Sequence, residues 1–525
     1  MKPVKKFSAV ASVIWLAIVF LWSFTTLQGL LRSGRGAGSS LVDLPRDIHD
    51  GMLACCWRKN ALVALNGGWT RLLGKRLCNG VYRLNGQGRL FGDSPSLLSA
   101  GEVERRGKSL ARLRDYIGSW GGRLLYVQPP YGIDLGKTML PYGALPGRVH
   151  GDENADRIIG VCRREGVPVL DMRTFMSATP EQVDSSFYRT DHHWRIESVF
   201  KAFPEILAAM RGLSVVGDEI RWDESKWKYV FHPGFFLGYW GRKTGCLFSG
   251  FDDFGYYETD TGDMSMSVPS LHYFKKGPFN DVVIFRKHLG GGTSTANRNA
   301  VYIGENVPLA VIRNPSAAAG KKVLVLKDSF ARPIIAFLST VFKEVHAIDP
   351  RLFKTDISEY AAAVRPDCVL VCYNPVSVSN KNSYWFDFGK FRPAPNQDGG
   401  EIVAGNIEVD VSAVKNQWAW ESLPVQFAPN SWYRITFKID ASPKVAGVSV
   451  RLYDTVSQKY VNTAMFSNEG PAAVIDWMFH IGENNAQLVL YAGIAGKTAG
   501  NKIRYFDVSI EKFASGKTNP ALLPF

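Results

Sequence analysis

The sequence lacks the cysteine patterns that identify a structural metal site or a disulfide-stapled fold. Its 525 residues include only seven cysteines, an odd number that leaves at least one thiol unpaired. Cys368 and Cys372 alternate with apolar residues in PDCVLVCYN, so we interpret them as buried strand residues. The glycine run HLGGGTST is not followed by the Gly-Lys-Ser/Thr of a phosphate loop. We therefore expect no metal and no cofactor.

Long apolar runs are also scarce, and one of them lies near the N-terminus. Residues 7–31 carry no charge, a length sufficient for one membrane-spanning helix. No small-x-small cleavage site follows, which favours a retained signal anchor over residues 1–31; the alternative is a removed signal peptide. Because no comparable run appears downstream, the sequence predicts a single-pass inner-membrane protein with its body in the periplasm.

Acidic residues are fewer than basic ones, and the formal net charge is +14. This excess suits an anionic lipid surface or an acidic polymer. It would suit nucleic acid as well, but an exported chain seldom meets nucleic acid. We therefore expect no nucleic-acid partner.

The residue patterns divide the body of the chain into two regions. The Gly/Ser-rich stretch 32–40 predicts a linker. Over 41–391 strand-like runs alternate with helical patterns, which predicts an α/β domain with a mainly parallel sheet; the aromatic and glycine-rich segment near 220–300 is interpreted as an inserted lobe. A second linker is predicted at 392–400, followed over 401–525 by the alternating strands of a β-sandwich.

One serine occupies the place where α/β proteins keep their functional groups. In KKVLVLKDSFARPIIAFL an apolar strand stops before Asp328 and a helical pattern begins, so Ser329 lies at the carboxyl end of a strand. The alternative is that Asp328 or Ser329 only caps the helix. Ser94 in RLFGDSPSLL has the literal GDS signature of lipase-like hydrolases, but no apolar strand leads to it, so we favour Ser329 as the nucleophile.

A nucleophilic serine needs a base and an orienting acid, and the stretch FYRTDHHWRIESVF contains both residue types. A carboxylate two residues before an imidazole can accept the Nδ1 proton and turn Nε2 toward a nucleophile. Asp191 and His193 have this spacing, whereas His192 should point elsewhere. The alternatives are Asp191 as a helix cap, with the histidines as polar turn residues, and a metal site, for which no third ligand has a recognisable spacing.

These motifs carry a resemblance to a known family. FYRTDHHW, GYWGRKTG, VLVLKDSFARPIIAFL and VLVCYNP occur in the same order as in the bacterial DHHW proteins and the periplasmic alginate O-acetyltransferases, which the sequence resembles over about residues 81–380. The resemblance implies an SGNH-hydrolase-like fold in which Asp191 and His193 are the acid and base and Ser329 is the nucleophile. The sequence departs from classical GDS enzymes at Lys327, where those enzymes have glycine.

The resemblance also implies two further site residues. Asn374, at the end of VLVCYN, resembles the asparagine that helps to bind the oxyanion in SGNH enzymes; the alternative is a turn residue before a proline. Arg351 follows another expected strand and is a candidate to bind an acidic sugar or the acyl carbonyl; the alternative is a surface arginine.

The activity that the resemblance implies is O-acetylation of an exopolysaccharide, acidic or neutral, through an acetyl-serine intermediate. The acetyl donor would be a membrane-bound O-acyltransferase partner. The alternatives are a polysaccharide acetyl esterase and a non-catalytic polysaccharide-binding scaffold of an export complex. Trp418 and Trp420 in NQWAWES lie on one face of an expected strand, so they are predicted to stack on sugar rings as part of a carbohydrate-binding module, unless they belong to the core.

Overall fold

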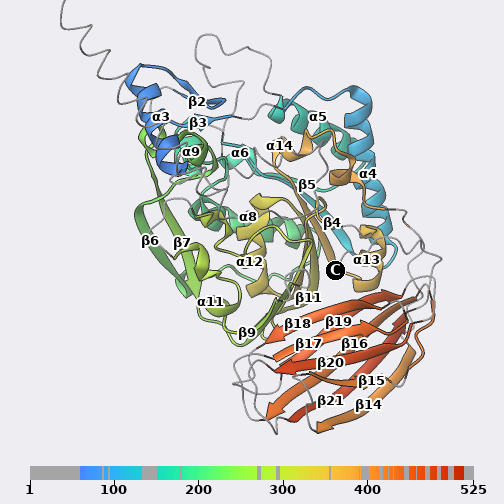
Figure 1. Cartoon of the computed structure of the whole chain (residues 1–525). Helices are drawn as coiled ribbons and strands as arrows, with labels where there is room; N and C mark the ends of the chain where they lie inside the picture. The colour runs from blue at the N-terminus through green and yellow to red at the C-terminus, as the bar shows by residue number, and fades with distance from the viewer. Residues whose placement is uncertain are drawn as a thin grey trace, which may run out of the picture. The chain divides into compact units, whose positions relative to one another are not determined.

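The computed structural model describes most of the chain between residues 59 and 513 (Figure 1). The described ranges are 59–84, 88–92, 95–132, 150–176, 180–268, 273–290, 296–353, 356–389, 391, 401–412, 418–423, 425–429, 431–442, 448–456, 458–466, 473–481, 486–494 and 502–513. The predicted anchor at 1–31 and the predicted linkers at 32–40 and 392–400 lie outside them. Among the described residues, no helix has the length and apolar character that a membrane span requires.

The chain divides into two compact units. Unit 1 comprises Met1–Gly92 and Tyr239–Phe251, and unit 2 comprises Asp93–Gly238 and Asp252–Phe525. The elements of unit 1 are α3 (Lys59–Leu72), β1 (Leu77–Cys78), β2 (Val81–Arg83), β3 (Leu90–Phe91), α9 (Tyr239–Thr244) and α10 (Cys246–Ser249). The three strands form an antiparallel sheet in the order β1-β2-β3, and Trp240 and Phe248 bury their rings in the same small core as residues of these strands.

Unit 2 is built on an eight-stranded sheet in the order β5-β4-β13-β11-β12-β10-β8-β9. Five neighbouring strands are parallel, and the last three pair antiparallel at one edge. In sheet order the strands are β5 (Val169–Asp171), β4 (Arg123–Gln128), β13 (Cys368–Cys372), β11 (Ala319–Lys327), β12 (Phe342–Ile348), β10 (Leu309–Arg313), β8 (Met264–Val268) and β9 (Tyr273–Gly277). The predicted α/β class with a mainly parallel sheet is therefore confirmed. The sequence analysis did not predict the antiparallel strands at one edge, which make the sheet mixed.

The two faces of this sheet have separate hydrophobic cores, because successive side chains of a strand point to opposite faces. In β11, Val323 and Val325 belong to one core, and Leu324 and Leu326 belong to the other. The first core receives α8 (Ile196–Gly212) and α12 (Arg332–Val341), and the second receives α4 (Ala100–Gly118), α5 (Gly151–Arg164) and α13 (Ile357–Val364). A strand buried on both faces needs the uninterrupted apolar run that β11 has.

Short elements complete the α/β part of unit 2. They are α6 (Arg173–Met176), α7 (Pro180–Ser186), η1 (Glu224–Lys226), β6 (Trp227–Phe236), β7 (Asp252–Thr259), α11 (Phe279–Val282), η3 (Arg286–His288), η4 (Arg298–Ala300), η5 (Ser329–Ala331), α14 (Pro375–Val378) and η6 (Ser383–Phe386). Within the segment 220–300, β6 and β7 form a two-stranded antiparallel sheet, whereas β8 and β9 extend the large sheet. This segment thus supplies β8 and β9, two of the three antiparallel strands at the edge of the large sheet.

The C-terminal region contains strands and no helices among its described residues. Two four-stranded antiparallel sheets have the orders β14-β21-β16-β19 and β15-β20-β17-β18 (Figure 1). The strands are β14 (Glu401–Ser412), β15 (Trp418–Ser422), β16 (Ser431–Ser442), β17 (Val448–Asp454), β18 (Lys459–Phe466), β19 (Ala473–Ile481), β20 (Leu488–Ile494) and β21 (Lys502–Phe513). In β16 the side chains of Tyr433, Ile435, Phe437 and Ile439 are buried, as the alternating pattern predicts.

Candidate active site

Ser329 lies at the carboxyl end of β11, in the turn η5 that leads into α12. The cap of this turn is Asp328, because its Oδ1 accepts a hydrogen bond from the Phe330 amide at 2.8 Å. Ser329 is therefore not the capping residue, and its hydroxyl is available for another partner. Residue Ser329 is half-buried at the carboxyl end of this strand.

Asp328 is fixed in place by Asn374, the residue that follows β13. Asp328 Oδ2 accepts hydrogen bonds from the Asn374 backbone amide and from its side-chain Nδ2, each at 2.7 Å. Burial raises the pKa of Asp328, although the amides of Asn374 and Phe330 oppose this effect. Asn374 Oδ1 accepts from the amides of Val376 and Ser377 and so caps α14. The structure thus places the Asn374 side chain against Asp328, with Nδ2 already donating.

Asp191 and His193 lie in the turn that precedes α8. The Asp191 carboxylate does not cap that helix, whose N-cap is Arg195. Instead, Asp191 Oδ1 accepts a hydrogen bond from the His193 amide at 2.9 Å and lies 2.6 Å from His193 Nδ1. The Nε2 atom of the same ring lies 2.7 Å from Ser329 Oγ. The structure therefore brings the hydroxyl, imidazole and carboxylate into one chain of hydrogen bonds, although 136 residues separate His193 from Ser329.

The environment keeps this carboxylate charged. Burial alone would raise the pKa of Asp191, whose side chain is 1% exposed. The nearby imidazoles of His193 and His192 and the hydrogen bonds from His193 outweigh burial and hold the pKa of Asp191 well below its usual range. An ionised Asp191 accepts a hydrogen bond from Nδ1–H and stabilises a positive charge on the ring.

Trp194 connects the turn of Asp191 and His193 to η5, the turn that carries Ser329. Its indole is 2% exposed, and Nε1 donates a hydrogen bond of 3.0 Å to the carbonyl of Phe330, the residue after Ser329. The Phe330 ring packs against the His193 ring, with 4.9 Å between centroids, and against the Trp194 ring at 5.8 Å. Hydrophobic packing and one directed hydrogen bond therefore set the distance between the base and the hydroxyl.

Two residues that the sequence analysis missed hold the turn before Asp191. Asp252, 1% exposed at the start of β7, accepts hydrogen bonds at 2.7 Å from both the amide and the hydroxyl of Thr190. The Thr190 hydroxyl in turn accepts from the Gly238 amide at 2.8 Å. A Cβ atom on Gly238 would lie 2.3 Å from the Asp191 Cβ, so this position must be glycine. The only signal in the sequence was a glycine within GYWGRKTG, which does not indicate what it contacts.

His192 lies beside both Asp191 and His193. Its ring centroid is 4.1 Å from that of His193, and its Nδ1 is 3.6 Å from Asp191 Oδ1. The ligand atoms of Asp191, His192 and His193 lie within 4.8 Å of one another, a grouping that the sequence analysis did not expect. However, two ligands of one tetrahedral zinc are about 3.3 Å apart. The shorter 2.6 Å contact between Asp191 and His193 is the distance of a hydrogen bond.

Arg351 follows β12 and pairs with a buried carboxylate. Its Nε and Nη2 atoms donate to the two oxygens of Asp349 at 2.8 and 2.6 Å, and its guanidinium lies 5.3 Å from the Trp385 ring centroid. Burial would lower the pKa of Arg351, but Asp349 raises it. Lys327, fully buried, has its Nζ 3.5 Å from the same carboxylate, and burial lowers its pKa to about 8. The structure thus places Arg351 in one cluster of ion pairs with Asp349 and Lys327.

Two groups of predicted site residues lie partly or wholly outside the part of the chain that the structure describes. Asp93 and Ser94 are not among the described residues. Trp418 and Trp420 are described by their backbone, which pairs β15 with Gly493 and Tyr491 of β20. Their side chains fall outside the description, so a role in binding sugars stays a prediction.

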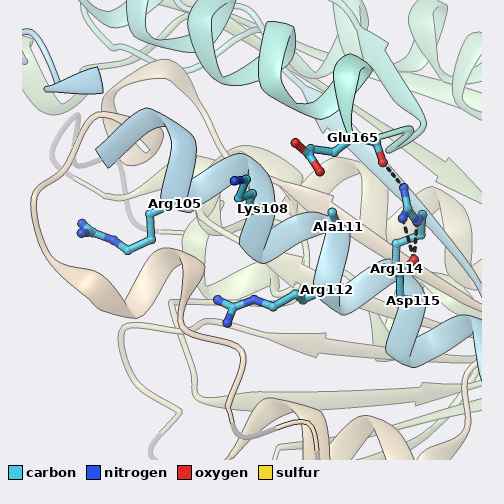
Figure 2. Close-up of a pocket in the computed structure, with 7 residues that line it drawn as sticks. All are labelled: Arg105, Lys108, Ala111, Arg112, Arg114, Asp115 and Glu165. Carbon is cyan, nitrogen blue, oxygen red and sulfur yellow. Dashed lines mark hydrogen bonds and ion pairs between the residues drawn. The ribbon is translucent and has the colours of Figure 1, made fainter. Parts of the chain in front are cut away.

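A separate hollow of about 430 Å³ lies over α4. Its lining residues are Arg105, Lys108, Ala111, Arg112, Arg114, Asp115 and Glu165. Figure 2 shows three of the basic side chains extending from one helix, while Arg114 donates to Asp115 and to the carbonyl of Glu165. This mixture of charges has no nucleophile beside a base, and none of the predicted site residues lines it.

The α/β sheet, the serine at the end of β11 and the Asp-His pair that contacts it are the features expected of an SGNH hydrolase-like domain. Residues 88–219 match the family model described as SGNH hydrolase-like domain, acetyltransferase AlgX. The resemblance predicted from the sequence is therefore confirmed. The matched residues include Asp191 and His193 and end before Ser329.

Solved structures give weaker similarities. PatB1 of Bacillus cereus is 20% identical with a TM-score of 0.48, and the match covers 59% of this chain and 99% of PatB1. A DHHW family protein of Eubacterium siraeum is 16% identical with a TM-score of 0.46, covering 60% of this chain and 96% of that protein. The C-terminal β region resembles a CBM4 structure, at 13% identity and a TM-score of 0.17, covering 20% of this chain and 83% of the other. No match was found among curated proteins.

Proposed function

We propose that this protein is an O-acetyltransferase that modifies an exopolysaccharide in the periplasm through an acetyl-serine intermediate. The observation that carries the proposal is the continuous set of hydrogen bonds from Ser329 Oγ to His193 Nε2 at 2.7 Å and from His193 Nδ1 to Asp191 at 2.6 Å. The match of residues 88–219 to the acetyltransferase AlgX model supports the same chemistry.

In the first half of the reaction, Ser329 Oγ attacks the carbonyl carbon of an acetyl donor while His193 Nε2 removes the hydroxyl proton. Ionised Asp191 stabilises the imidazolium that forms. The tetrahedral intermediate then collapses, and His193 gives its proton to the leaving group. The product is an acetyl ester on Ser329 with a neutral His193.

In the second half, a sugar hydroxyl occupies the position that the leaving group vacated. His193 Nε2 removes its proton, and the sugar oxygen attacks the acetyl carbonyl. Collapse of the second intermediate returns the proton from His193 to Ser329 Oγ and releases the acetylated polymer. Asn374 and Arg351 are proposed to help bind the oxyanion or the substrate, and each would first have to exchange part of its present pairing with Asp328 or Asp349.

The remaining parts of the proposal follow from the sequence. The uncharged residues 7–31 would anchor the body at the inner membrane, next to a membrane-bound O-acyltransferase that supplies the acetyl group. The C-terminal region, with Trp418 and Trp420 as stacking residues, would hold the polymer near Ser329. Holding a polymer at a second site raises its effective concentration at the first.

Two alternatives make different predictions. A polysaccharide acetyl esterase would use the same residues and admit water to the acetyl-serine. A non-catalytic scaffold would bind polysaccharide without any covalent step, and the hydrogen-bonded Ser329, His193 and Asp191 argue against it.

The deciding experiment incubates the purified full-length chain in detergent with a chromogenic acetyl ester and with acidic or neutral oligosaccharides. Mass spectrometry then measures acetyl groups on sugar, on protein and in free acetate. We expect acetylated sugar and an acetylated Ser329. Acetate alone would indicate an esterase, and polymer binding without either product would indicate a scaffold.

Two variants make that experiment specific. Ser329→Ala should remove both acetyl products and keep the melting temperature within a few degrees, because a half-buried hydroxyl at a strand end adds little stability. Ser339→Ala is the matched control: its hydroxyl is buried in α12, the helix that follows the turn of Ser329, and donates to the Ala336 carbonyl. The control should keep full activity.

A further inference from the structure

A buried asparagine lies on the Nδ1 side of the His193 ring. Asn299 is 9% exposed in the turn η4, and its side-chain amide nitrogen lies 3.1 Å from His193 Nδ1. Asp191 Oδ1 lies 2.6 Å from the same nitrogen. Two side chains therefore meet one ring nitrogen, which carries at most one proton.

The position of that proton decides what Asn299 does. For His193 Nε2 to accept the proton of Ser329, Nε2 must be unprotonated, so the ring proton is on Nδ1. An Nδ1–H group donates to Asp191 and has no lone pair to accept from an amide N–H. A rotation of the Asn299 amide by 180° exchanges its nitrogen and oxygen without moving any other atom. The amide oxygen then faces Nδ1–H.

We propose that Asn299 Oδ1 is a second acceptor for the Nδ1 proton of His193, and that Asn299 is thus a positioning residue for the base. Its role rests on the proposed function, because it acts through His193 and touches neither Ser329 nor the acyl group. Asn299 and Asp191 together favour the tautomer with an unprotonated Nε2. Both acceptors also stabilise the imidazolium that forms when Ser329 gives up its proton.

Two buried arginines hold the turn that carries Asn299. Its neighbour Arg298 is fully buried and donates to the carbonyls of Phe235 and His288 at 2.7 and 2.9 Å. Arg332, 2% exposed at the start of α12, donates to the Asn299 carbonyl at 3.4 Å. Because α12 follows directly after the turn that carries Ser329, this contact couples Asn299 to the same segment as the nucleophile.

A neutral amide suits this position better than a second carboxylate. Two titratable side chains already lie next to the His193 ring: Asp191 at Nδ1 and His192 beside the ring. Another carboxylate beside Asp191 would place two like charges a few ångströms apart, which favours protonation of one of them. An amide oxygen accepts the hydrogen bond at every pH. The Asn299 amide would therefore give the Nδ1 proton of His193 an acceptor whose charge does not change with pH.

The test uses three variants of the full chain. Asn299→Leu removes the acceptor and keeps nearly the same shape. Asn299→Asp keeps an acceptor oxygen and removes the amide N–H donor. Asn314→Leu is the matched control, because Asn314 is also buried and its side chain bonds only to backbone groups, the Ser339 carbonyl and the Ser316 amide. The readouts are kcat and KM for a chromogenic acetyl ester and the tautomer of His193 by ¹⁵N NMR of histidine-labelled protein.

The expected results separate acceptor from donor. Asn299→Leu should lower kcat about tenfold at unchanged KM, the size of one lost hydrogen bond to an ionised group, and should populate the tautomer with the proton on Nε2. Asn299→Asp should keep the proton on Nδ1, whereas its kcat should fall, because the added carboxylate stands beside the charged Asp191. Asn314→Leu should lower the melting temperature and leave kcat and the tautomer unchanged.

Two outcomes would overturn the proposal. A ring proton on Nε2 in Asn299→Asp, as in Asn299→Leu, means that Asn299 acts as a donor to Nδ1. An Asn299→Leu protein with the wild-type tautomer and kcat means that the residue only fills space. The NMR measurement needs no turnover, so if the wild-type chain cleaved no ester, the function would fail while the tautomer would still decide the role of Asn299.

Discussion

Among the described residues, two histidines each follow a carboxylate by two residues, in Asp191-x-His193 and Glu344-x-His346. In both pairs a carboxylate oxygen bonds to a ring nitrogen, at Nδ1 of His193 and at Nε2 of His346. The pairs differ in what the second nitrogen contacts. His193 Nε2 lies 2.7 Å from the half-buried hydroxyl of Ser329, whereas His346 Nδ1 lies 2.6 Å from the hydroxyl of Tyr360 inside the second core.

The two pairs also differ in their environment. His346 lies in the middle of the sheet on β12 and is 3% exposed. Burial lowers the pKa of His346, although Glu344 opposes this effect. Burial would raise the pKa of Glu344, but the hydrogen bond from His346 holds it well below its usual range. The comparison teaches that the carboxylate-x-His spacing creates the pair, and that the contact of the other ring nitrogen, with a serine in one pair and with a buried tyrosine in the other, distinguishes the two pairs.

The strongest way to break the comparison is to remove each imidazole in turn. His193→Gln should lower kcat for ester cleavage by about 10³-fold or more, because no other group accepts the Ser329 proton. His346→Gln should keep kcat within about twofold and lower the free energy of unfolding by about 1–3 kcal/mol, since it leaves buried partners unpaired. Steady-state kinetics and urea unfolding measure both effects. An inactive but stable His346→Gln protein would contradict this division of roles.

A second test displaces the carboxylate of the first pair without changing it. Gly238→Ala would place a methyl group 2.3 Å from the Asp191 Cβ and 2.6 Å from the Thr190 carbonyl oxygen. The turn must shift, so we expect kcat to fall about 10- to 100-fold and the unfolding free energy to fall by about 1–3 kcal/mol. Gly160→Ala is the control, because a Cβ there meets no atom within 4 Å. Wild-type activity in Gly238→Ala would mean that the position of Asp191 is not critical.

The smallest effect concerns the stability of the second pair at acid pH. The pKa of His346 is lowered in the folded state, so the neutral ring contributes stability above its ordinary value of 6.5 that is lost as the pH falls through the lower folded value. Glu344, whose pKa is also lowered, loses its contribution only below its ordinary value of 4.5. Urea unfolding between about pH 7 and 5 should therefore show wild-type stability falling by about 1 kcal/mol more than that of His346→Gln. A wild-type chain that gains stability relative to this variant on acidification would refute the assignment of His346 as neutral.

Much of the fold could be predicted because local patterns encode it. The apolar run Val323–Leu326 predicted a strand, and the structure places it between the two cores. The alternating C-terminal strands predicted the antiparallel sheets in the same way. The antiparallel edge of the large sheet could not be predicted. Its strands β8 and β10 pair although more than 40 residues separate them in the sequence, and a short strand carries no local signal of its partner.

The candidate site was partly predictable for the same reason. The spacing in the sequence determined that Asp191 could reach His193, because two residues in one turn are neighbours wherever that turn lies. The run from strand to helix likewise determined that Ser329 stands at a strand end. The tertiary structure alone decided that His193 rather than His346 meets the Ser329 hydroxyl, and that Gly238, Asp252 and Asn299 surround the pair. The physical reason is that hydrogen bonds and close packing between distant segments depend on where the chain returns, which no local pattern specifies.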